Sequence, residues 1–421
     1  MHRGARDAYQ VARALREAGL LETLVTDLYW PADRAWARGF ERIAPRKASA
    51  ALRCRHADSL PSASVESRWM SGLGSLMAHK ARYLPFAWQR GAIRWCDRDL
   101  GREAGRIAAR KGAALLSYSY YAHSAFSSHV TDHPRILFQL HPHPLSVRSI
   151  LQQERQLHPD CASSLDTEWE LALPEPDFLR LVEEVSMAQH WIVASQFTKK
   201  TLVDAGIPAE RIVVVPYGIE LSSFSCKAEA GWPGGPLRLL FVGTLGQRKG
   251  IKYLLQALEL LPKGSVQLTV CGRPVDDLAI FRESGLPVQL YPSIGAQGLR
   301  DAYRAADVFV FPSLAEGFGQ VLLEAMASGL PIIATTRTAA PDLVEHGREG
   351  YIVSPGSASE LATKIEEFLR EPSRIPTMGA AARRRAEHFS WLRFRQGVAA
   401  FVSEVLAQAT NPSFSRTCSS H

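Results

Sequence analysis

The sequence predicts an α/β protein made of two doubly wound parallel-sheet domains that face a cleft. Three observations lead to this prediction. The chain has 421 residues, close to three times the size of an ordinary domain. Short apolar runs alternate with helical segments, which is typical of βαβ units. A Gly- and Pro-rich stretch at 225–236 separates one such alternation from a second.

The composition is that of an ordinary soluble protein, with 46% hydrophobic and 22% charged residues. It excludes disordered, collagen-like and coiled-coil proteins. The sequence contains no apolar run of the roughly 18 residues that a membrane span needs. Its six cysteines form no CxxC pair, which argues against a zinc site or a disulfide framework. We therefore expect a cytoplasmic protein, or one attached to the inner face of the cell membrane.

The N-terminal half, residues 1–222, is predicted to form the first domain. A helix over 7–18 ends at Gly19, a favourable residue after a helix C-terminus. Residues 60–112 are predicted to be a helical insertion. Buried parallel strands are predicted from short apolar runs, which lie at 21–29, 113–119, 135–141, 190–195 and 211–218.

One element of this domain is missing from the pattern. A doubly wound domain opens with a buried strand, yet here the first helix begins only about six residues after Met1. Either the first strand is absent from this chain or its start lies further upstream. We expect an in-frame hydrophobic strand of about five to six residues upstream.

The second domain is predicted over residues 237–389. Its strands are apolar runs bounded by helices and Gly or Pro turns, and they lie at 237–243, 266–272, 288–293, 307–313, 331–335 and 351–354. An amphipathic helix over 390–409 is expected to pack back on the N-terminal domain. The polar tail 410–421 is predicted to be disordered.

The most informative segment is PSLAEGFGQVLLEAMASGLP, residues 312–331. A strand ends at Phe311, a glycine-containing loop follows, and a helix begins near Gln320. Glycines let a ligand approach the backbone, and a helix N-terminus favours an anion. Glu316 in the loop and Glu324 in the helix would accept hydrogen bonds from hydroxyl groups. This arrangement suits a nucleotide sugar, although a surface loop with a capping glutamate would leave the same pattern.

A second segment, FVGTLGQRKGIKYLL at 241–255, places Arg248 and Lys249 in a turn after a strand. Cations at the carboxyl end of a parallel strand suit a phosphate group. An exposed basic turn would look the same. Neither a P-loop nor a GxGxxG fingerprint is present, which argues against a Walker ATPase or an NAD enzyme.

Taken together, these segments resemble the donor domain of retaining family-4 glycosyltransferases (glycosyl transferases group 1) with the GT-B fold, two Rossmann-like domains around a cleft. EGFGQVLLEA matches the E-x7-E motif of that family, and RKG matches its phosphate-binding turn. The resemblance covers roughly residues 180–390 and fades over the first 110. It implies transfer of a sugar from a nucleotide-diphosphate sugar with retention at the anomeric carbon.

The resemblance also implies roles for individual residues. Lys249, with Arg248 beside it, would hold the donor diphosphate, since the family's usual arginine is replaced here by Thr244. Glu316 would contact the donor sugar and Glu324 the ribose. The backbone of the loop would wrap the phosphate and sugar, through Gly317, Phe318, Gly319 and Gln320. Gly4 would lie in a glycine-rich turn over the diphosphate.

A histidine after the strand in FQLHPHPLS, residues 138–146, matches the active-site histidine of the family. His141 is the closer match in spacing and His143 is the alternative. Outside the family context, a hydrogen-bonded histidine in a Pro-rich turn would explain either residue. No metal and no cofactor are expected, because fixed cations and a helix N-terminus can stabilise the departing diphosphate.

The charge of the chain is unevenly distributed. Residues 1–111 contain 21 Lys and Arg against 11 Asp and Glu, a net charge of +10. This segment also contains the aromatic residues Trp69, Tyr83, Phe86, Trp88 and Trp95. An anionic membrane surface is therefore a candidate partner, and nucleic acid is not expected. The alternative is that these aromatics form the core of the helical insertion.

The sequence thus predicts a glycosyltransferase that acts on a glycan, lipid-linked or small-molecule acceptor in bacterial polysaccharide or glycoconjugate biosynthesis. Two alternatives stay open. One is a non-catalytic nucleotide-sugar-binding or scaffold protein. The other is a different GT-B enzyme, such as an epimerase or a phosphorylase.

Overall fold

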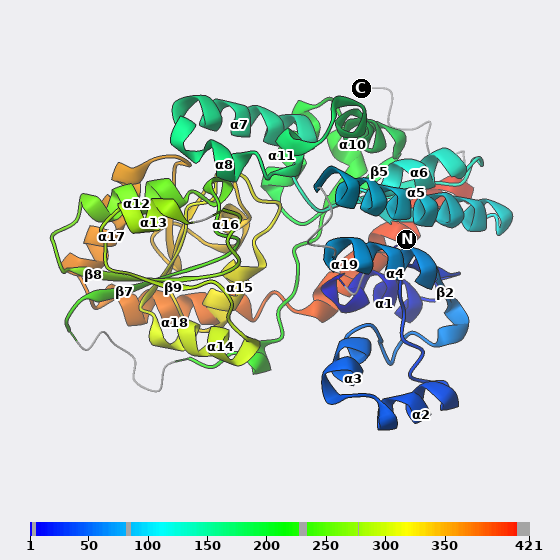
Figure 1. Cartoon of the computed structure of the whole chain (residues 1–421), viewed down its shortest axis with the longest axis horizontal. Coiled ribbons are helices and arrows are strands. Elements are labelled where there is room, and N and C mark those ends of the chain that lie inside the picture. Colours follow the sequence, from blue (N-terminus) through cyan, green and yellow to red (C-terminus); the bar gives the residue numbers. More distant parts are fainter. Residues whose placement is uncertain (2–5, 81–85, 227–233, 277, 411–421) are drawn as a thin grey trace.

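The computed structural model describes residues 1, 6–80, 86–226, 234–276 and 278–410. These residues form two larger parallel sheets, of four and six strands, each covered by helices on both faces, and a small two-stranded parallel sheet (Figure 1). The predicted α/β class with two parallel-sheet domains is therefore confirmed. Among the described residues, no helix is both long enough and apolar enough to span a membrane.

The N-terminal sheet has four parallel strands in the order β3-β4-β5-β6. Their bounds are Leu115–Tyr118, Arg135–Gln139, His190–Val193 and Ile212–Val214. Its helices are α1 (Gln10–Glu17), α5 (Phe86–Arg110), α6 (Ala122–Ser128), α7 (Pro144–Leu157), α8 (Ala162–Leu165), α9 (Trp169–Ala172), α10 (Glu175–Met187) and α11 (Gln196–Asp204). Side chains of α1 pack on one face of this sheet, and side chains of α5, α6, α10 and α11 pack on the other.

A second, two-stranded parallel sheet lies apart from the four-stranded one. It pairs β1 (Leu24–Thr26) with β2 (Val65–Ser67). Around it lie α2 (Ala35–Ile43), α3 (Arg46–Arg53) and α4 (Trp69–Lys80). The predicted helical insertion over 60–112 therefore contains a strand, β2, ahead of its two α-helices. A three-residue strand is too short to leave a recognisable apolar pattern.

The C-terminal sheet has six parallel strands in the order β12-β11-β10-β7-β8-β9. Their bounds, from β7 to β12, are Leu237–Val242, Val266–Cys271, Val288–Tyr291, Val308–Phe311, Ile332–Thr335 and Gly350–Val353. The central strands are buried on both faces, which is why each reads as a continuous apolar run. Its helices are α12 (Ile251–Glu259), α13 (Ala279–Glu283), α14 (Ala296–Ala305), α15 (Gln320–Ala327), α16 (Ala340–Leu343), α17 (Ala358–Arg370) and α18 (Arg374–Ala386).

The final helix, α19 (Trp391–Thr410), returns to the N-terminal half. Its Phe394, Val398 and Val402 are buried in one cluster with Val11 of α1 and Phe138 of β4. The chain passes between the domains at Gly218 and again just before Trp391, and we call these two stretches the crossing segment. It is tightly packed, since a Cβ atom on Gly218 would lie 2.2 Å from the backbone nitrogen of Trp391. Residues 411–421, where disorder is predicted, lie outside the described residues.

Candidate active site

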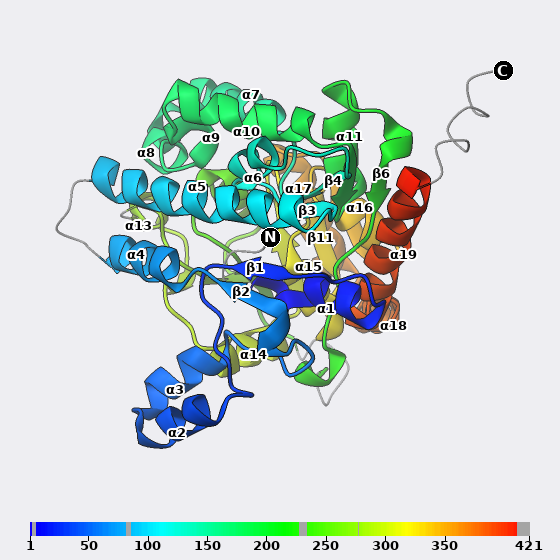
Figure 2. The ribbon, with the colours of Figure 1, turned by 90° about the vertical axis from the view of Figure 1, so that its right-hand side faces the viewer.

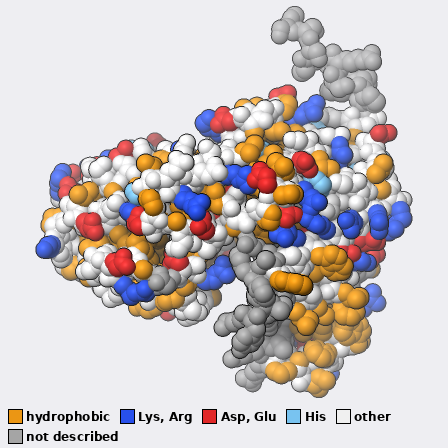
Figure 3. Space-filling view, turned by 45° about the horizontal axis from the view of Figure 1, so that its top comes forward, with side chains coloured by type: hydrophobic (Ala, Val, Ile, Leu, Met, Phe, Trp, Pro, Cys, Tyr) orange, Lys and Arg blue, Asp and Glu red, His pale blue; other side chains and the backbone are white. Residues whose placement is uncertain are grey.

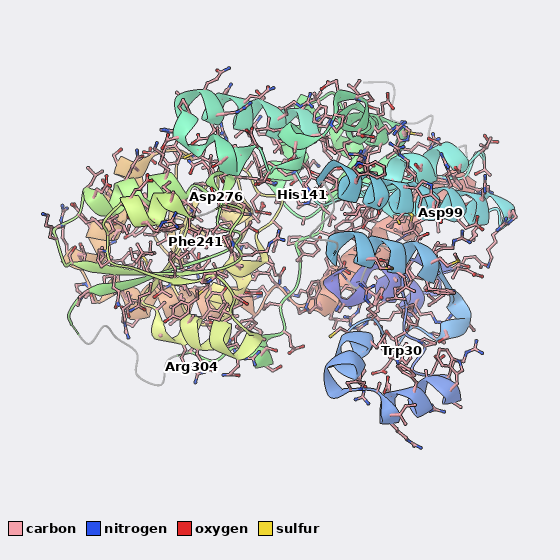
Figure 4. All side chains as sticks on the ribbon, in the orientation of Figure 1. Trp30, Asp99, His141, Phe241, Asp276 and Arg304 are labelled. Atoms are coloured by element: carbon pink, nitrogen blue, oxygen red, sulfur yellow. The ribbon has the colours of Figure 1, made fainter. Side chains whose placement is uncertain are left out.

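A pocket of about 650 Å³ lies between the two domains, at the carboxyl ends of their parallel strands. This is where parallel α/β sheets bind ligands. Asp7, Tyr118, Leu140, His141 and Tyr217 line it from the N-terminal side. The other lining residues are Ile219, Glu220, Phe224, Val242, Gly243, Thr244, Lys249, Phe311, Glu316, Phe318, Gly319, Gln320, Val321, Glu324 and Trp391. Figure 4 shows His141 where the two halves meet.

Lys249 and Glu316 form an ion pair within this pocket. Lys249 ends a tight turn after β7, and Gly250 follows with φ of 74°. A side chain at Gly250 would collide with the Pro312 carbonyl, so the turn lies directly against the strand that carries the Glu316 loop. Burial lowers the pKa of the Lys249 ammonium, and the Arg248 guanidinium lowers it further, while Glu168 opposes both.

The loop between β10 and α15 presents both backbone and side chains to the pocket. The backbone N–H of Glu316 donates to the Arg337 carbonyl over 2.9 Å, which fixes the start of the loop. Gly319 adopts a φ of 84° immediately before α15 begins at Gln320. The Gln320 side chain donates to the Gly218 carbonyl over 2.8 Å, so it anchors the helix start to the crossing segment. The N-terminus of α15 therefore opens into the pocket, as the sequence predicts.

Gly317 has a different position from its neighbours in the motif. Its carbonyl accepts hydrogen bonds from Ser195 Oγ at 2.5 Å and Thr198 Oγ1 at 3.2 Å, both in the N-terminal half. A Cβ atom on Gly317 would lie 1.9 Å from the Leu140 carbonyl oxygen. Gly317 is therefore a contact between the domains and holds the Glu316 loop against the strand end that carries His141.

Glu324 lies one turn into α15 and lines the same pocket. The Tyr303 hydroxyl donates to its Oε2 over 2.9 Å. Burial raises the pKa of Glu324, and this hydrogen bond partly offsets the rise. Tyr303 thus fixes one carboxylate oxygen of Glu324 within the pocket.

Arg248 is not among the residues that line the pocket. Its guanidinium is buried, donates to the Ala315 carbonyl over 3.0 Å and pairs with Glu168 over 3.0 Å. Although burial lowers the pKa of Arg248, the Glu170 and Glu168 carboxylates raise it above its ordinary value. The structure therefore pairs the Arg248 guanidinium with Glu168 and the Ala315 carbonyl, and the predicted contact of Arg248 with a diphosphate stays a prediction. Adjacent side chains of the turn point in different directions, and that of Arg248 crosses to the other domain.

The two candidate histidines occupy distinct environments. His141 follows β4, lines the pocket, and packs edge-on against the Tyr120 ring with centroids 4.9 Å apart. His143 is buried, and its ring Nδ1 caps α7 by accepting a hydrogen bond from the Leu145 N–H. The backbone N–H of His143 donates to Thr201 Oγ1 over 2.9 Å. Burial lowers the pKa of His143 to about 4. The geometry brings His141, not His143, to the other predicted site residues.

Some pocket residues were not predicted from the sequence, and one predicted residue is not described. Gly4 lies outside the described residues. Asp7 enters the pocket just before α1 and accepts a 2.6 Å hydrogen bond from the Tyr118 hydroxyl. Tyr217 and Trp391 line the pocket from the two stretches of chain that connect the domains. Of these residues, only Tyr118 could have been predicted from the sequence, because it stands at the end of a predicted strand.

No group of three or more His, Cys, Asp or Glu is placed to hold a metal ion within the described part of the chain. The pocket instead combines the Lys249 ammonium, a helix N-terminus and four carboxylate side chains, which are those of Asp7, Glu220, Glu316 and Glu324. Such a site can bind an anionic group at the helix end and hydroxyl groups at the carboxylates.

Comparison with solved structures shows the fold class. Sucrose-phosphate synthase from Thermosynechococcus elongatus aligns with a TM-score of 0.61 and 20% identity, over 95% of this chain and 92% of that one. Anabaena HepE in complex with UDP aligns with a TM-score of 0.59 and 18% identity, over 94% and 96%. The fold is that of GT-B glycosyltransferases.

Comparison with sequences locates the relationship in the C-terminal half. Residues 236–371 match the family Glycosyl transferases group 1. D-inositol 3-phosphate glycosyltransferase of Arthrobacter sp. (strain FB24) is 32% identical over 201 residues, 44% of this chain and 48% of the relative. Sulfoquinovosyl transferase SQD2 of Arabidopsis thaliana is 29% identical over 214 residues, 48% and 41%. The chain thus spans about half the length of the curated relatives that it matches, and its homologues are glycosyltransferases.

Proposed function

We propose that the protein is a retaining glycosyltransferase that moves a sugar from a nucleotide-diphosphate sugar to a glycan, lipid-linked or small-molecule acceptor. The proposal depends above all on the convergence of Lys249, Glu316, Glu324 and the α15 N-terminus on one interdomain pocket, with His141 opposite. Retention of configuration is inferred from the E-x7-E resemblance. A role in polysaccharide or glycoconjugate biosynthesis is part of the proposal, and the bacterial homologue named D-inositol 3-phosphate glycosyltransferase supports the sugar transfer itself.

The chemistry assigned to each group follows from its charge and position. Lys249 and the N–H groups at the start of α15 would stabilise the negative charge that grows on the departing diphosphate. Glu316 would accept hydrogen bonds from the sugar, and Glu324, with one oxygen fixed by Tyr303, from the ribose. His141 would approach the sugar from the N-terminal domain. These residues supply the required charges without a metal ion, so the reaction should proceed in the presence of a chelator.

A donor panel with product analysis tests the proposal. UDP-, GDP- and ADP-sugars are first screened by thermal shift, since a ligand at a hundred times its dissociation constant stabilises a protein by about 2.7 kcal/mol. The donor that binds is then incubated with candidate acceptors and EDTA, and the anomeric configuration of the product is read by NMR. A product of retained configuration supports the proposal.

Other results would favour the alternatives. Donor binding with neither transfer nor hydrolysis across the panel favours a scaffold protein. Isomerisation of the free donor favours an epimerase. Phosphate-dependent release of a sugar phosphate favours a phosphorylase. A transferred sugar of inverted configuration removes the retaining assignment but keeps the glycosyltransferase.

We further propose that the N-terminal helices bind an anionic membrane surface. Trp69 on α4 and Trp88 and Trp95 on α5 are 57%, 74% and 65% exposed, so they are not core residues of the insertion. The side chains of Tyr83 and Phe86 lie outside the described residues. Figure 3 shows hydrophobic side chains gathered at the lower right of the molecule, with Lys and Arg above them. Aromatic rings favour the headgroup region, and basic groups contribute about 1 kcal/mol each near an anionic surface.

Vesicle co-sedimentation tests this surface. Binding should rise with the anionic lipid fraction and fall with salt, because the Debye length is roughly 8 Å at physiological ionic strength. Replacing Trp69, Trp88 and Trp95 together by Ser should abolish binding. A matched control replaces the exposed residues Leu157, Leu260 and Leu392 by Ser and should retain it. Equal, negligible binding of the wild-type protein to neutral and anionic vesicles at low salt would contradict the proposal.

A further inference from the structure

Tyr120 connects the candidate histidine to two buried glutamates that do not line the interdomain pocket. It follows β3, and its ring packs edge-on against His141 with centroids 4.9 Å apart. Its hydroxyl donates to Oε1 of Glu170, and its backbone N–H donates to Oε1 of Glu184. These two glutamates are 0% and 1% exposed. Burial of a carboxylate is costly, so two of them around one tyrosine point to more than packing.

The backbone of Tyr120 has a conformation that a bulky residue rarely adopts. Its φ is 78°, in the left-handed region. The Glu184 carboxylate holds this turn by accepting from the N–H groups of Tyr120, of Ala122 over 2.9 Å and of His123 over 3.1 Å. Burial raises the pKa of Glu184 to about 8, and these three hydrogen bonds partly offset the rise. Residues kept in strained conformations by their surroundings cluster at functional sites. The strained turn thus fixes the point from which the Tyr120 ring reaches His141.

Glu170 holds the other end of the tyrosine. It lies on α9, which packs against α7 through Leu171 (Figure 2). The Arg148 side chain donates to the Glu170 backbone carbonyl over 2.9 Å, so the helix is fixed at this residue. Burial raises the pKa of the Tyr120 hydroxyl, and the Glu170 carboxylate raises it further. Tyr120 therefore stays protonated and remains the donor in this hydrogen bond.

Glu170 also interacts with a cation of the opposite domain. The Arg248 guanidinium reaches across from the turn after β7 and pairs with Glu168, two residues before Glu170, over 3.0 Å. Burial lowers the pKa of Arg248, and Glu170 raises it more than Glu168 does. Helix α9 thus lies between the donor-side turn and Tyr120. A series of interactions runs from Arg248 through Glu170 and Tyr120 to His141.

We propose that Glu170 and Tyr120 are positioning residues that hold the His141 ring in place at the interdomain pocket. Neither of them lines the pocket, so they act through His141 and not on a donor. The Glu170 carboxylate fixes the Tyr120 hydroxyl, and the fixed Tyr120 ring restricts rotation of the His141 ring. The effect on turnover rests on the proposed function, in which His141 approaches the sugar. The orientation of His141 does not, and it is measured without any substrate.

NMR of isotope-labelled histidine tests the orientation directly. Tyr120→Phe keeps the ring and removes the hydroxyl, Glu170→Leu removes the acceptor, and Glu170→Gln keeps an acceptor oxygen. The ring signals of His141 are assigned by their loss in His141→Gln. Because the rings of Tyr and Phe are alike, a shift of these signals in Tyr120→Phe reports movement of the ring. The signals should shift in the same direction in Tyr120→Phe and Glu170→Leu and stay near those of the wild type in Glu170→Gln.

Steady-state kinetics then tests the consequence for turnover. In Tyr120→Phe and in Glu170→Leu, kcat should fall about tenfold or more while the donor KM changes less than about twofold, since a misplaced group slows the chemical step. The double variant should lose no more than the larger single loss, because both residues act through one hydrogen bond. Glu170→Gln should retain most of the wild-type kcat.

Tyr253→Phe is the matched control, because the Tyr253 hydroxyl also donates to a buried glutamate, Glu154, over 2.9 Å. It should lower stability in urea comparably but leave kcat and the His141 signals unchanged. Unmoved His141 signals in both Tyr120→Phe and Glu170→Leu would overturn the proposal, and so would losses of kcat that multiply in the double variant. If the wild-type protein transfers no sugar from any donor, the proposed function fails, and the NMR comparison alone decides whether these residues position His141.

Discussion

The ammonium of Lys249 and the carboxylate of Glu316 pair directly with each other in the interdomain pocket. The two residues belong to the carboxyl ends of neighbouring strands, β7 and β10, so the pair follows from the parallel sheet itself. In the proposed function, Lys249 binds the diphosphate of the donor and Glu316 binds its sugar. A donor must therefore take over both partners of an existing ion pair, and variants of the two residues should differ in their effects.

Glu316→Gln should collapse turnover while leaving the fold intact. The expected loss is about 2–4 kcal/mol of transition-state stabilisation, comparable to removing one preorganised electrostatic contact. Affinity for the nucleoside diphosphate alone should not fall, because Lys249 loses its competing carboxylate. Steady-state kinetics and calorimetric titration with UDP or the preferred diphosphate measure the two effects. Wild-type turnover would remove Glu316 from the active site.

Lys249→Ala should weaken binding of the nucleoside diphosphate itself. The cation addresses the phosphates, and a hydrogen bond to a charged group contributes about 1.5–3 kcal/mol. Titration with the diphosphate, with no sugar attached, measures the loss. If sugar selectivity changed and diphosphate affinity did not, the assignment of Lys249 would be wrong.

Arg248→Met should destabilise the protein without a specific effect on donor binding. The substitution leaves Glu168 and the buried Glu170 without the guanidinium, and breaking a buried ion pair costs about 3–5 kcal/mol. Urea denaturation measures this loss, and adding Glu168→Gln should recover part of it. Loss of diphosphate affinity in a variant of unchanged stability would instead return Arg248 to the pocket.

Gly317→Ala should impair catalysis through the domain interface. The added methyl group would force the Glu316 loop away from Leu140 and His141. A misplacement of about 1 Å can cost roughly a hundredfold in rate. Gly39→Ala is the matched control, since nothing lies within 4 Å of its added methyl group. Equal kcat/KM in the two variants would show that the interdomain contact is not needed for turnover.

His143→Asn should flatten the acid limb of the stability profile. Because the pKa of His143 falls from 6.5 to about 4 on folding, the folded state binds fewer protons than the unfolded state between these values. Stability therefore falls as the pH drops from 6.5 toward 4, by at most about 3 kcal/mol from this group. Asn retains a helix-capping side chain. Urea unfolding across this range should give a shallower slope for the variant, and parallel curves would contradict the assignment.

The strand–loop–helix segments could be predicted from the sequence because interactions between residues close in the chain determine their conformation. The apolar run to Phe311, the glycines at 317 and 319 and the helix from Gln320 each specify their own conformation, and parallel pairing brings β7 and β10 together. The direction of the Arg248 side chain was not readable, because it depends on Glu168, 80 residues away. Likewise, β2 has three residues and depends on pairing with β1. The sequence could not distinguish His141 from His143, because the difference is that His143 caps α7 and is buried, whereas His141 lines the pocket.

The return of α19 to the N-terminal sheet has a consequence for how this protein can be cut and recombined. The N-terminal domain is not a contiguous stretch of chain, since Phe394, Val398 and Val402 complete its core. Exchange of the donor half with that of a relative therefore requires two junctions, one near 225–236 and one just before Trp391. A single-crossover chimera, which replaces everything after the linker, would pair the first half with a foreign closing helix and leave Val11 and Phe138 against the wrong surface.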